Sequence, residues 1–229
     1  MNLSAPLIRH LGRVDYEPTW RAMQAFTEAR DAATPDELWV VEHPPVYTVG
    51  VAGRAEHLPA VQTSIPVVRI DRGGQITYHG PGQAVVYTLI DLARRGIKVR
   101  EMVCVIEKSV IALLAERGVD STSKPGAPGI YIPRLNGAKI GALGLKVRKG
   151  CCFHGVSLNV DVDLAPFLDI DPCGYPGLAV TRTADLGIPG SAAELGDALA
   201  QHISARIVAD TAITCSPDTA MNDTHAHAR

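Results

Sequence analysis

The sequence predicts an α+β fold in which a mixed β-sheet packs against helices. Runs of β-branched and apolar residues predict several strands, and two segments carry apolar residues at helical spacing. The helices and strands do not alternate regularly, which argues against a doubly wound parallel sheet. The chain has 229 residues, of which 46% are hydrophobic and 20% charged. This size and composition suit a single domain, which we expect over residues 1–215.

The first half of the chain predicts one helix followed by strands. A helix is expected over residues 17–33, because Trp20, Met23 and Phe26 recur at helical spacing. Apolar and β-branched runs predict strands at residues 38–50, 66–71 and 83–92. The segment between the last two, RGGQITYHGPG, is expected to be mostly loop.

The second half predicts two helices and further strands. Residues 98–117 carry a regular apolar stripe and predict an amphipathic helix. Ser191 and Glu194 form a capping-box pattern at the start of a last helix. Strands are expected at residues 129–133, 138–147 and 152–160. The polar tail 216–229 is expected to lack fixed structure.

Composition excludes several classes of function. The net charge of −2 argues against a general nucleic-acid binder. No apolar run is long enough to cross a bilayer, and the N-terminal segment lacks the pattern of a secretory signal. We therefore expect a cytoplasmic protein with no membrane partner. A Cys-x-x-Cys pair is absent, so no metal site is expected.

The segment RGGQITYHGPGQ (residues 72–83) is rich in glycine and in polar side chains. Glycine lets the backbone approach a ligand closely, and the polar side chains add donors and acceptors. This composition suits a small-molecule site, although Gly-Pro-Gly is also ordinary turn chemistry. The phosphate-loop pattern is absent.

Two residues are candidates for nucleophilic catalysis. Lys139 lies among small and apolar residues in NGAKIGALG. Burial there would favour its neutral amine, which can act as a base; the alternative is a surface lysine whose stem covers apolar surface. Cys173 lies in the tight loop IDPCGYPG. An exposed loop thiol beside a base is a candidate nucleophile, and the alternative is a solvent-facing cysteine without function.

The remaining cysteines and two histidines are weaker candidates. The other cysteines are Cys104, Cys151, Cys152 and Cys215. Cys104 is expected in the core, and at most one of the vicinal pair can face a pocket, because neighbours in a strand point to opposite faces. His79 and His154 could each serve as a general base or orient a neighbour.

Several segments together resemble the lipoyl(octanoyl) transferase family. The matching stretches are residues 41–50, 56–58, 72–92, 137–147 and 154–182. The glycine-rich loop, the lysine of GAKI and the cysteine of PCG occur in the family's order. Three such motifs in register make the resemblance highly specific.

The resemblance implies a fold shared with lipoate and biotin protein ligases. It also implies transfer of an octanoyl group from octanoyl-acyl carrier protein to a lysine of lipoyl domains, through an enzyme thioester and without a cofactor. The implied acceptors are the lipoyl domains of 2-oxoacid dehydrogenase complexes and the glycine cleavage H protein.

The resemblance also assigns residues. Cys173 takes the role of nucleophile, and Lys139 the role of activating it. Three segments would bind the acyl substrate: Arg72, Gly73, Gly74, Gln75, Ile76, Thr77, Tyr78 and His79; Ala142, Leu143 and Gly144; and Gly155, Val156 and Ser157.

Two further expectations concern the reaction. Backbone N–H groups near Lys139–Ile140 or in the 72–79 loop would stabilise the oxyanion. Basic side chains are candidates for docking an acidic carrier protein, or they are ordinary solvated surface: Arg94, Arg95, Lys98, Arg100, Lys146, Arg148 and Lys149.

Two other functions fit the same fold. An ATP-dependent lipoate or biotin protein ligase would bind an adenylate and need no cysteine nucleophile. A non-catalytic acyl-binding or amidotransferase-like relative would not need the pair Cys173 and Lys139.

Overall fold

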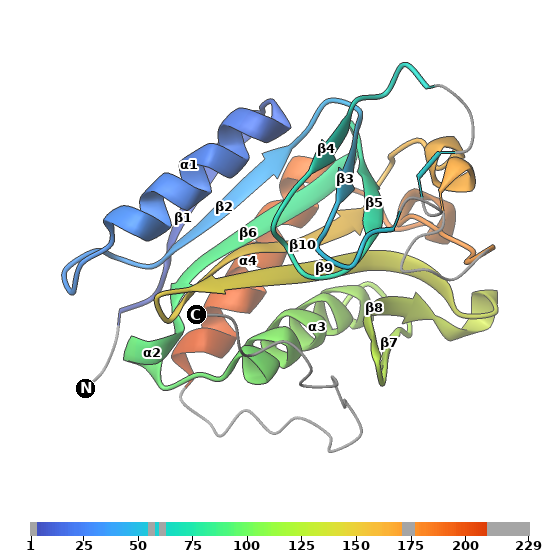
Figure 1. Ribbon diagram of the computed structural model, residues 1–229. Coiled ribbons are helices and arrows are strands. Elements are labelled where there is room, and N and C mark those ends of the chain that lie inside the picture. The colour runs from blue at the N-terminus through green and yellow to red at the C-terminus, as the bar shows by residue number, and fades with distance from the viewer. Residues whose placement is uncertain (1–3, 55–57, 60–62, 171–176, 210–229) are drawn as a thin grey trace.

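The computed structural model describes residues 4–54, 58–59, 63–170 and 177–209. Its strands are β1 (Leu7–Arg13), β2 (Glu37–Glu42), β3 (Val46–Val49), β4 (Val67–Arg69), β5 (Ile76–His79), β6 (Gln83–Asp91), β7 (Thr122–Lys124), β8 (Ala127–Ile132), β9 (Ala138–Arg148) and β10 (Cys151–Asn159). Its α-helices are α1 (Tyr16–Ala29), α2 (Leu92–Arg95), α3 (Val99–Ala115) and α4 (Ala192–Val208). A mixed sheet with flanking helices confirms the predicted α+β class (Figure 1).

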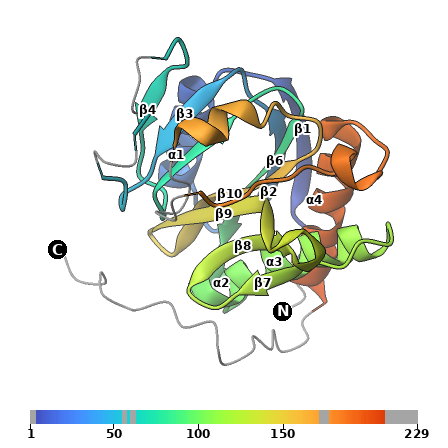
Figure 2. The same ribbon diagram turned by 90° about the vertical axis from the view of Figure 1, so that its right-hand side faces the viewer.

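A seven-stranded sheet with the order β1-β2-β6-β10-β9-β8-β7 forms the centre of the fold. Helices α3 and α4 pack on one face, where they enclose the largest apolar cluster, and α1 packs on the other (Figure 1). In the turned view, the hairpin of β7 and β8 lies against α3 (Figure 2). Apolar residues cover both faces of the central strands, which explains why the sequences of β6 and β10 are apolar almost throughout.

A second, three-stranded sheet with the order β4-β3-β5 lies over the same face of the large sheet as α1 (Figure 1). Strand β5 occupies part of the segment expected to be mostly loop, and it pairs antiparallel with β3. The glycine-rich segment is therefore partly ordered as a strand, which holds its side chains against the large sheet.

The helix boundaries follow local chemistry. The predicted capping box is present: the Ser191 N–H donates to Glu194 Oε2 at 2.7 Å, and the Glu194 N–H donates to Ser191 Oγ at 3.2 Å. Helix α1 ends at Ala29 rather than at residue 33, because Asp31 accepts the N–H groups of Ala33 and Thr34 and forms a turn. The tail 216–229 lies outside the described residues.

Candidate functional site

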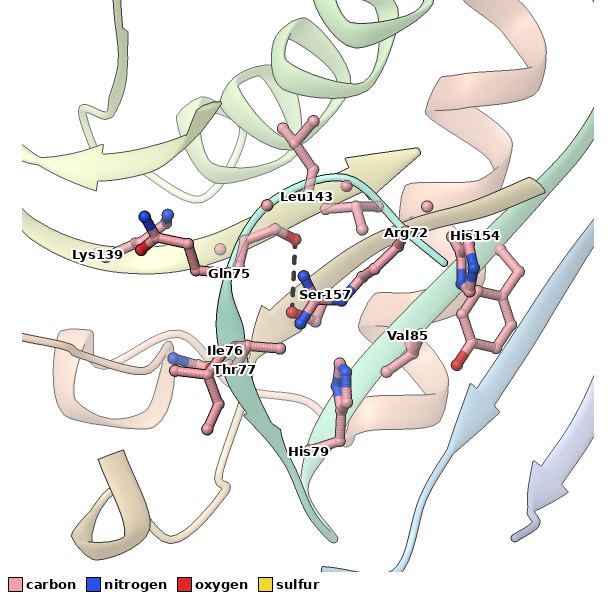
Figure 3. Close-up of a pocket in the computed structure, with 18 of the residues that line it drawn as sticks. Arg72, Gln75, Ile76, Thr77, His79, Val85, Lys139, Leu143, His154 and Ser157 are labelled. Carbon is pink, nitrogen blue, oxygen red and sulfur yellow. Dashed lines mark hydrogen bonds between the residues drawn. The ribbon is translucent and has the colours of Figure 1, made fainter. Parts of the chain in front are cut away.

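A pocket lies between the two sheets, and we call it the inter-sheet pocket (Figure 3). Strand β5 and the residues before it form one wall, and β6, β9 and β10 form the opposite wall. Its lining includes thirteen of the residues expected at the site: Arg72, Gly74, Gln75, Ile76, Thr77, His79, Lys139, Ala142, Leu143, Gly144, Gly155, Val156 and Ser157. Three separate sequence motifs thus meet at one cavity.

Two expected site residues, Tyr78 and Gly73, do not line this pocket, and a third lies outside the described residues. Tyr78 is not part of the lining of the inter-sheet pocket and packs against Tyr47 and Phe167. Gly73 donates its N–H to the Leu145 carbonyl oxygen at 3.0 Å and lines an adjoining cavity. Cys173 falls in residues 171–176, outside the described part of the chain.

The inter-sheet pocket also includes residues that the sequence motifs did not indicate. These are Tyr16, Val85, Tyr87, Gly141, Asn159, Phe167 and Val180. Val85 and Tyr87 alternate with their neighbours on β6 and face the same side as Gln83. Strand alternation could have identified these two and also Asn159, which lies two residues after Ser157 on β10, whereas Tyr16, Phe167 and Val180 come from other segments.

Lys139 is buried on β9, with 4% of its surface exposed. Its Nζ donates to the Pro128 carbonyl oxygen at 3.1 Å and lies 5.4 Å from the centre of the Tyr131 ring. Residue 129 is glycine where this side chain passes, because a Cβ there would lie 2.4 Å from Lys139 Cε. The backbone is thus shaped around a buried amine.

A buried carboxyl group on α3 interacts with this lysine. Glu107, on α3, interacts electrostatically with Lys139, and its Oε1 accepts the Gly129 N–H at 3.2 Å. Burial raises the pKa of Glu107, and the Gly129 hydrogen bond and the Lys139 charge oppose that rise. Helix α3 therefore contributes an acidic group to the surroundings of Lys139.

The segment that follows residues 171–176 runs beside Lys139. The Lys139 N–H donates to the Ala179 carbonyl oxygen at 2.8 Å, and the Thr181 N–H donates to the Lys139 carbonyl oxygen at 3.0 Å. Val180 thus pairs with Lys139 as an isolated parallel bridge. The backbone N–H of Lys139 is consequently occupied, so this group is not the expected oxyanion donor.

Buried polar side chains connect the glycine-rich segment to the strand of Lys139. His79 Nδ1 lies 2.7 Å from Gln83 Oε1, and Gln83 Nε2 donates to Asn159 Oδ1 at 2.9 Å. Asn159 Nδ2 then donates to the Thr181 carbonyl oxygen at 3.0 Å. Burial, together with the neighbouring His43, lowers the pKa of His79 to about 3. His79 is therefore neutral and acts here as a structural donor to Gln83.

A second buried histidine lies behind the inter-sheet pocket. His43 Nδ1 lies 2.6 Å from the Val14 carbonyl oxygen, and its Nε2 lies 2.7 Å from the Tyr87 hydroxyl. A carbonyl oxygen can only accept, so Nδ1 carries the proton and Nε2 accepts from Tyr87. Burial lowers the pKa of His43 to about 4.

His154 lines the pocket from β10 in an unusual backbone conformation. Its φ is 64°, although it lies inside a strand, and its Nε2 lies 3.0 Å from Asp71 Oδ1. Burial raises the pKa of Asp71, but hydrogen bonds from His154 and Trp20 outweigh this effect and lower it to about 2. Trp20 Nε1 donates to the same carboxylate at 2.8 Å. Asp71 thus connects β10, α1 and the start of the glycine-rich segment.

In Figure 3, Lys139 lies at one end of the inter-sheet pocket, and His79, Val85 and His154 lie toward the other. Arg72 is fixed by donating to the Thr48 carbonyl oxygen at 2.7 Å and to Thr48 Oγ1 at 2.9 Å. The pocket is thus elongated, with a buried amine at one end.

Cys151 and Cys152 are both buried on β10. Burial raises the pKa of the Cys152 thiol to about 12 and also raises that of Cys151. Both thiols therefore stay protonated near neutral pH, and neither lines the inter-sheet pocket. Cys104 is buried on α3, as expected.

Several candidate docking charges are instead used within the fold. Arg94 and Arg95 bind the buried carboxylate of Asp36, as does Arg30. Other basic residues pair with Glu28: Arg148 and Lys149. These four expected docking residues are therefore parts of ion pairs within the described part of the chain.

No helix among the described residues is both long and apolar enough to span a membrane. Within the same part of the chain, no three histidine, cysteine or acidic side chains gather as metal ligands would.

Comparison with known proteins assigns the family. The model of the lipoyl protein ligase A/B catalytic domain matches residues 15–210. The octanoyltransferase of Dechloromonas aromatica is 59% identical over 198 residues, covering 86% of this chain and 95% of the relative. That of Aromatoleum aromaticum is 61% identical over 195 residues, covering 85% and 83%.

Solved structures agree in fold. A bipartite lipoate protein ligase from Thermoplasma acidophilum superposes with a TM-score of 0.66 at 19% identity, covering 90% of this chain and 84% of that one. A biotin protein ligase from Aquifex aeolicus gives 0.52 at 12% identity, covering 88% and 70%. The chain therefore belongs to the lipoyl protein ligase A/B family and, within it, to the octanoyltransferases, which are acyltransferases.

Proposed function

We propose that this acyltransferase moves an octanoyl group from octanoyl-acyl carrier protein to a specific lysine of lipoyl domains, the first step of endogenous protein lipoylation. Cys173 carries the group as a thioester, and Lys139 moves the proton. The observation that carries the proposal is the buried Lys139 amine at one end of an elongated pocket, in a chain 59% identical to an octanoyltransferase.

Two contacts support the pairing of Cys173 with Lys139. Val180, which follows the segment of Cys173, is bridged to Lys139. The described residues on either side of that segment, Ile170 and Gly177, line one cavity. That cavity shares Phe167 and Val180 with the inter-sheet pocket.

The first half-reaction acylates the enzyme. Lys139 takes the Cys173 proton, and the thiolate bonds to the carbonyl carbon of the octanoyl thioester. The bond between that carbon and the carrier's sulfur breaks, and the leaving thiolate takes the proton from Lys139. Because the Lys139 N–H is occupied, oxyanion donors are expected from the 72–79 segment.

The second half-reaction uses the neutral amine of the acceptor lysine. Its nitrogen bonds to the carbonyl carbon as the bond to Cys173 breaks, and its proton passes to Lys139 and from there to the Cys173 thiolate. The octanoyl chain itself lies along the inter-sheet pocket, with the substrate-binding residues around it. The proposed acceptors are lipoyl domains of 2-oxoacid dehydrogenase complexes and the glycine cleavage H protein.

The test is incubation with octanoyl-acyl carrier protein in the absence of ATP, followed by intact-mass measurement. We expect a hydroxylamine-labile octanoyl adduct that Cys173→Ser abolishes. Cys151→Ser is the matched control and keeps the adduct. Full activity of Cys173→Ser, or a strict requirement for ATP, would overturn the proposal; the second result would favour an ATP-dependent ligase.

A further inference from the structure

A second cavity adjoins the inter-sheet pocket. It lies between the glycine-rich segment, the start of α3 and the β7–β8 hairpin. Three residues line both spaces and form the wall between them: Gly74, Gln75 and Leu143. We call this space the second cavity, and the proposed reaction so far leaves it unused.

Lys139 lies where the two spaces meet. Its side chain lines the inter-sheet pocket, and its Nζ donates to the carbonyl oxygen of Pro128, which lines the second cavity. A thioester carbonyl carbon carries two substituents, the acyl chain and the sulfur arm. A thioester whose carbonyl carbon lies near Lys139 can therefore extend its acyl chain into the inter-sheet pocket and its sulfur arm into the second cavity.

The lining of the second cavity suits an arm that is mainly apolar and carries amides. Val99, Val103 and Leu145 supply apolar surface. Gln75 Oε1 is buried and has no hydrogen-bond partner among the described residues. A buried acceptor without a partner is unfavourable, and an amide N–H of a bound ligand would satisfy it.

Two basic residues flank Val99, one of the residues that line the second cavity. Val99 is 41% exposed, and its sequence neighbours Lys98 and Arg100 are exposed too. One carboxylate nearby, that of Glu101, accepts the backbone N–H of Lys98 at 2.7 Å. Positive charge at the mouth suits a phosphate at the far end of a bound arm.

We infer that the second cavity binds the phosphopantetheine arm of the acyl donor. The inference rests on the proposed function. The acyl chain enters the inter-sheet pocket, the thioester lies near Lys139, and an amide of the arm donates to Gln75 Oε1. The phosphate lies at the rim beside Lys98 and Arg100.

The experiment blocks the cavity and compares two donors. Val99→Trp places a large ring in the cavity from an exposed position, so folding is preserved. The donors are S-octanoyl-4′-phosphopantetheine and S-ethyl thiooctanoate, which has no arm. Val208→Trp is the matched control, because Val208 is also at a helix end and 38% exposed. Acyl-enzyme formation is followed by intact mass.

We expect Val99→Trp to slow acylation by the phosphopantetheine donor at least tenfold and acylation by the ethyl thioester less than twofold. Val208→Trp should leave both rates unchanged. Equal slowing with both donors, or no slowing with either, would overturn the inference. So would slowing confined to octanoyl transfer from the pre-formed acyl-enzyme to a lipoyl domain, since the cavity would then take the acceptor lysine.

Gln75→Met gives a second measurement, because it removes the acceptor and keeps a similar side-chain length. Losing one amide hydrogen bond of about 1 kcal/mol should slow acylation by the phosphopantetheine donor roughly fivefold more than acylation by the ethyl thioester. If the wild-type chain is acylated by neither donor, the proposed function itself fails, and the inference fails with it.

Discussion

Two buried neutral histidines, His79 in the lining of the inter-sheet pocket and His43 behind it, predict a steep loss of stability in mild acid. Burial lowers the pKa of His43 to about 4 and, with the charge of His43, that of His79 to about 3. An unfolded histidine has a pKa near 6.5, so the unfolded chain binds protons first as the pH falls. The stabilisation is complete above pH 6.5 and is lost as the pH falls toward the folded values.

The size of this loss of stability follows from how far the folded-state pKa of each histidine lies below its unfolded value. Between pH 7.5 and 5.0, a histidine that stays neutral in the folded state loses about 2 kcal/mol of stability, and two lose about 4 kcal/mol. This is a large part of the free energy of unfolding of an ordinary domain, about 5–15 kcal/mol.

The assay is urea unfolding at both pH values, followed by the fluorescence of Trp20 and Trp39. His43→Gln should shrink the difference between pH 7.5 and 5.0 by about 2 kcal/mol relative to the wild type. His10→Gln, which replaces an exposed histidine on β1, is the matched control. An unchanged difference in His43→Gln would refute the reasoning.

Two further predictions concern the inter-sheet pocket and its strands. Val85→Phe should shift the preferred donor from octanoyl toward hexanoyl, and Val85→Ala should shift it toward decanoyl. In a competition of thioesters, each shift should amount to roughly fourfold for each methylene. An unchanged ranking would show that Val85 does not limit the length of the acyl chain. Gly155→Ala should lower the free energy of unfolding by about 1–3 kcal/mol, because its Cβ would lie 2.0 Å from the Val86 carbonyl oxygen. Gly141→Ala, with a nearest approach of 3.2 Å, should change it less in the same urea titration; equal effects would contradict the steric argument.

The elements with a strong apolar period could be predicted from the sequence. Helix α3 and strands β6 and β10 lie in the core and are apolar for that reason. Strand β1 was not predicted, because it is an edge strand, and LIRHLGR is largely exposed. Strand β5 was hidden in a glycine-rich segment, since its pairing with β3 depends on a partner distant in sequence.

The burial of Lys139 could also be predicted, from the small residues around it. The groups that surround Lys139 could not be predicted from the sequence. Glu107 comes from the polar margin of an amphipathic helix, and nothing in the helical period distinguishes it from a surface glutamate. The role of Cys173 stays a prediction, because its segment lies outside the described residues.

His154 explains why a strand pattern alone cannot give the shape of the pocket. On β10, Cys152 and Val156 face the large core cluster, so regular alternation would send His154 there as well. Its left-handed backbone instead turns the ring to the pocket face, where it stacks on Phe153 with 5.0 Å between ring centres. The carbonyl oxygen of His154 accepts from Thr88 Oγ1 at 3.1 Å.

Such a conformation is unfavourable for a histidine by about 1–3 kcal/mol and persists only where surrounding contacts enforce it. Here Asp71 supplies the contact, and Asp71 immediately precedes the glycine-rich segment that lines the pocket. The strain in β10 therefore positions that segment through one carboxylate. A motif can place Arg72 at the site, but its position relative to Lys139 depends on this contact between residues 83 positions apart.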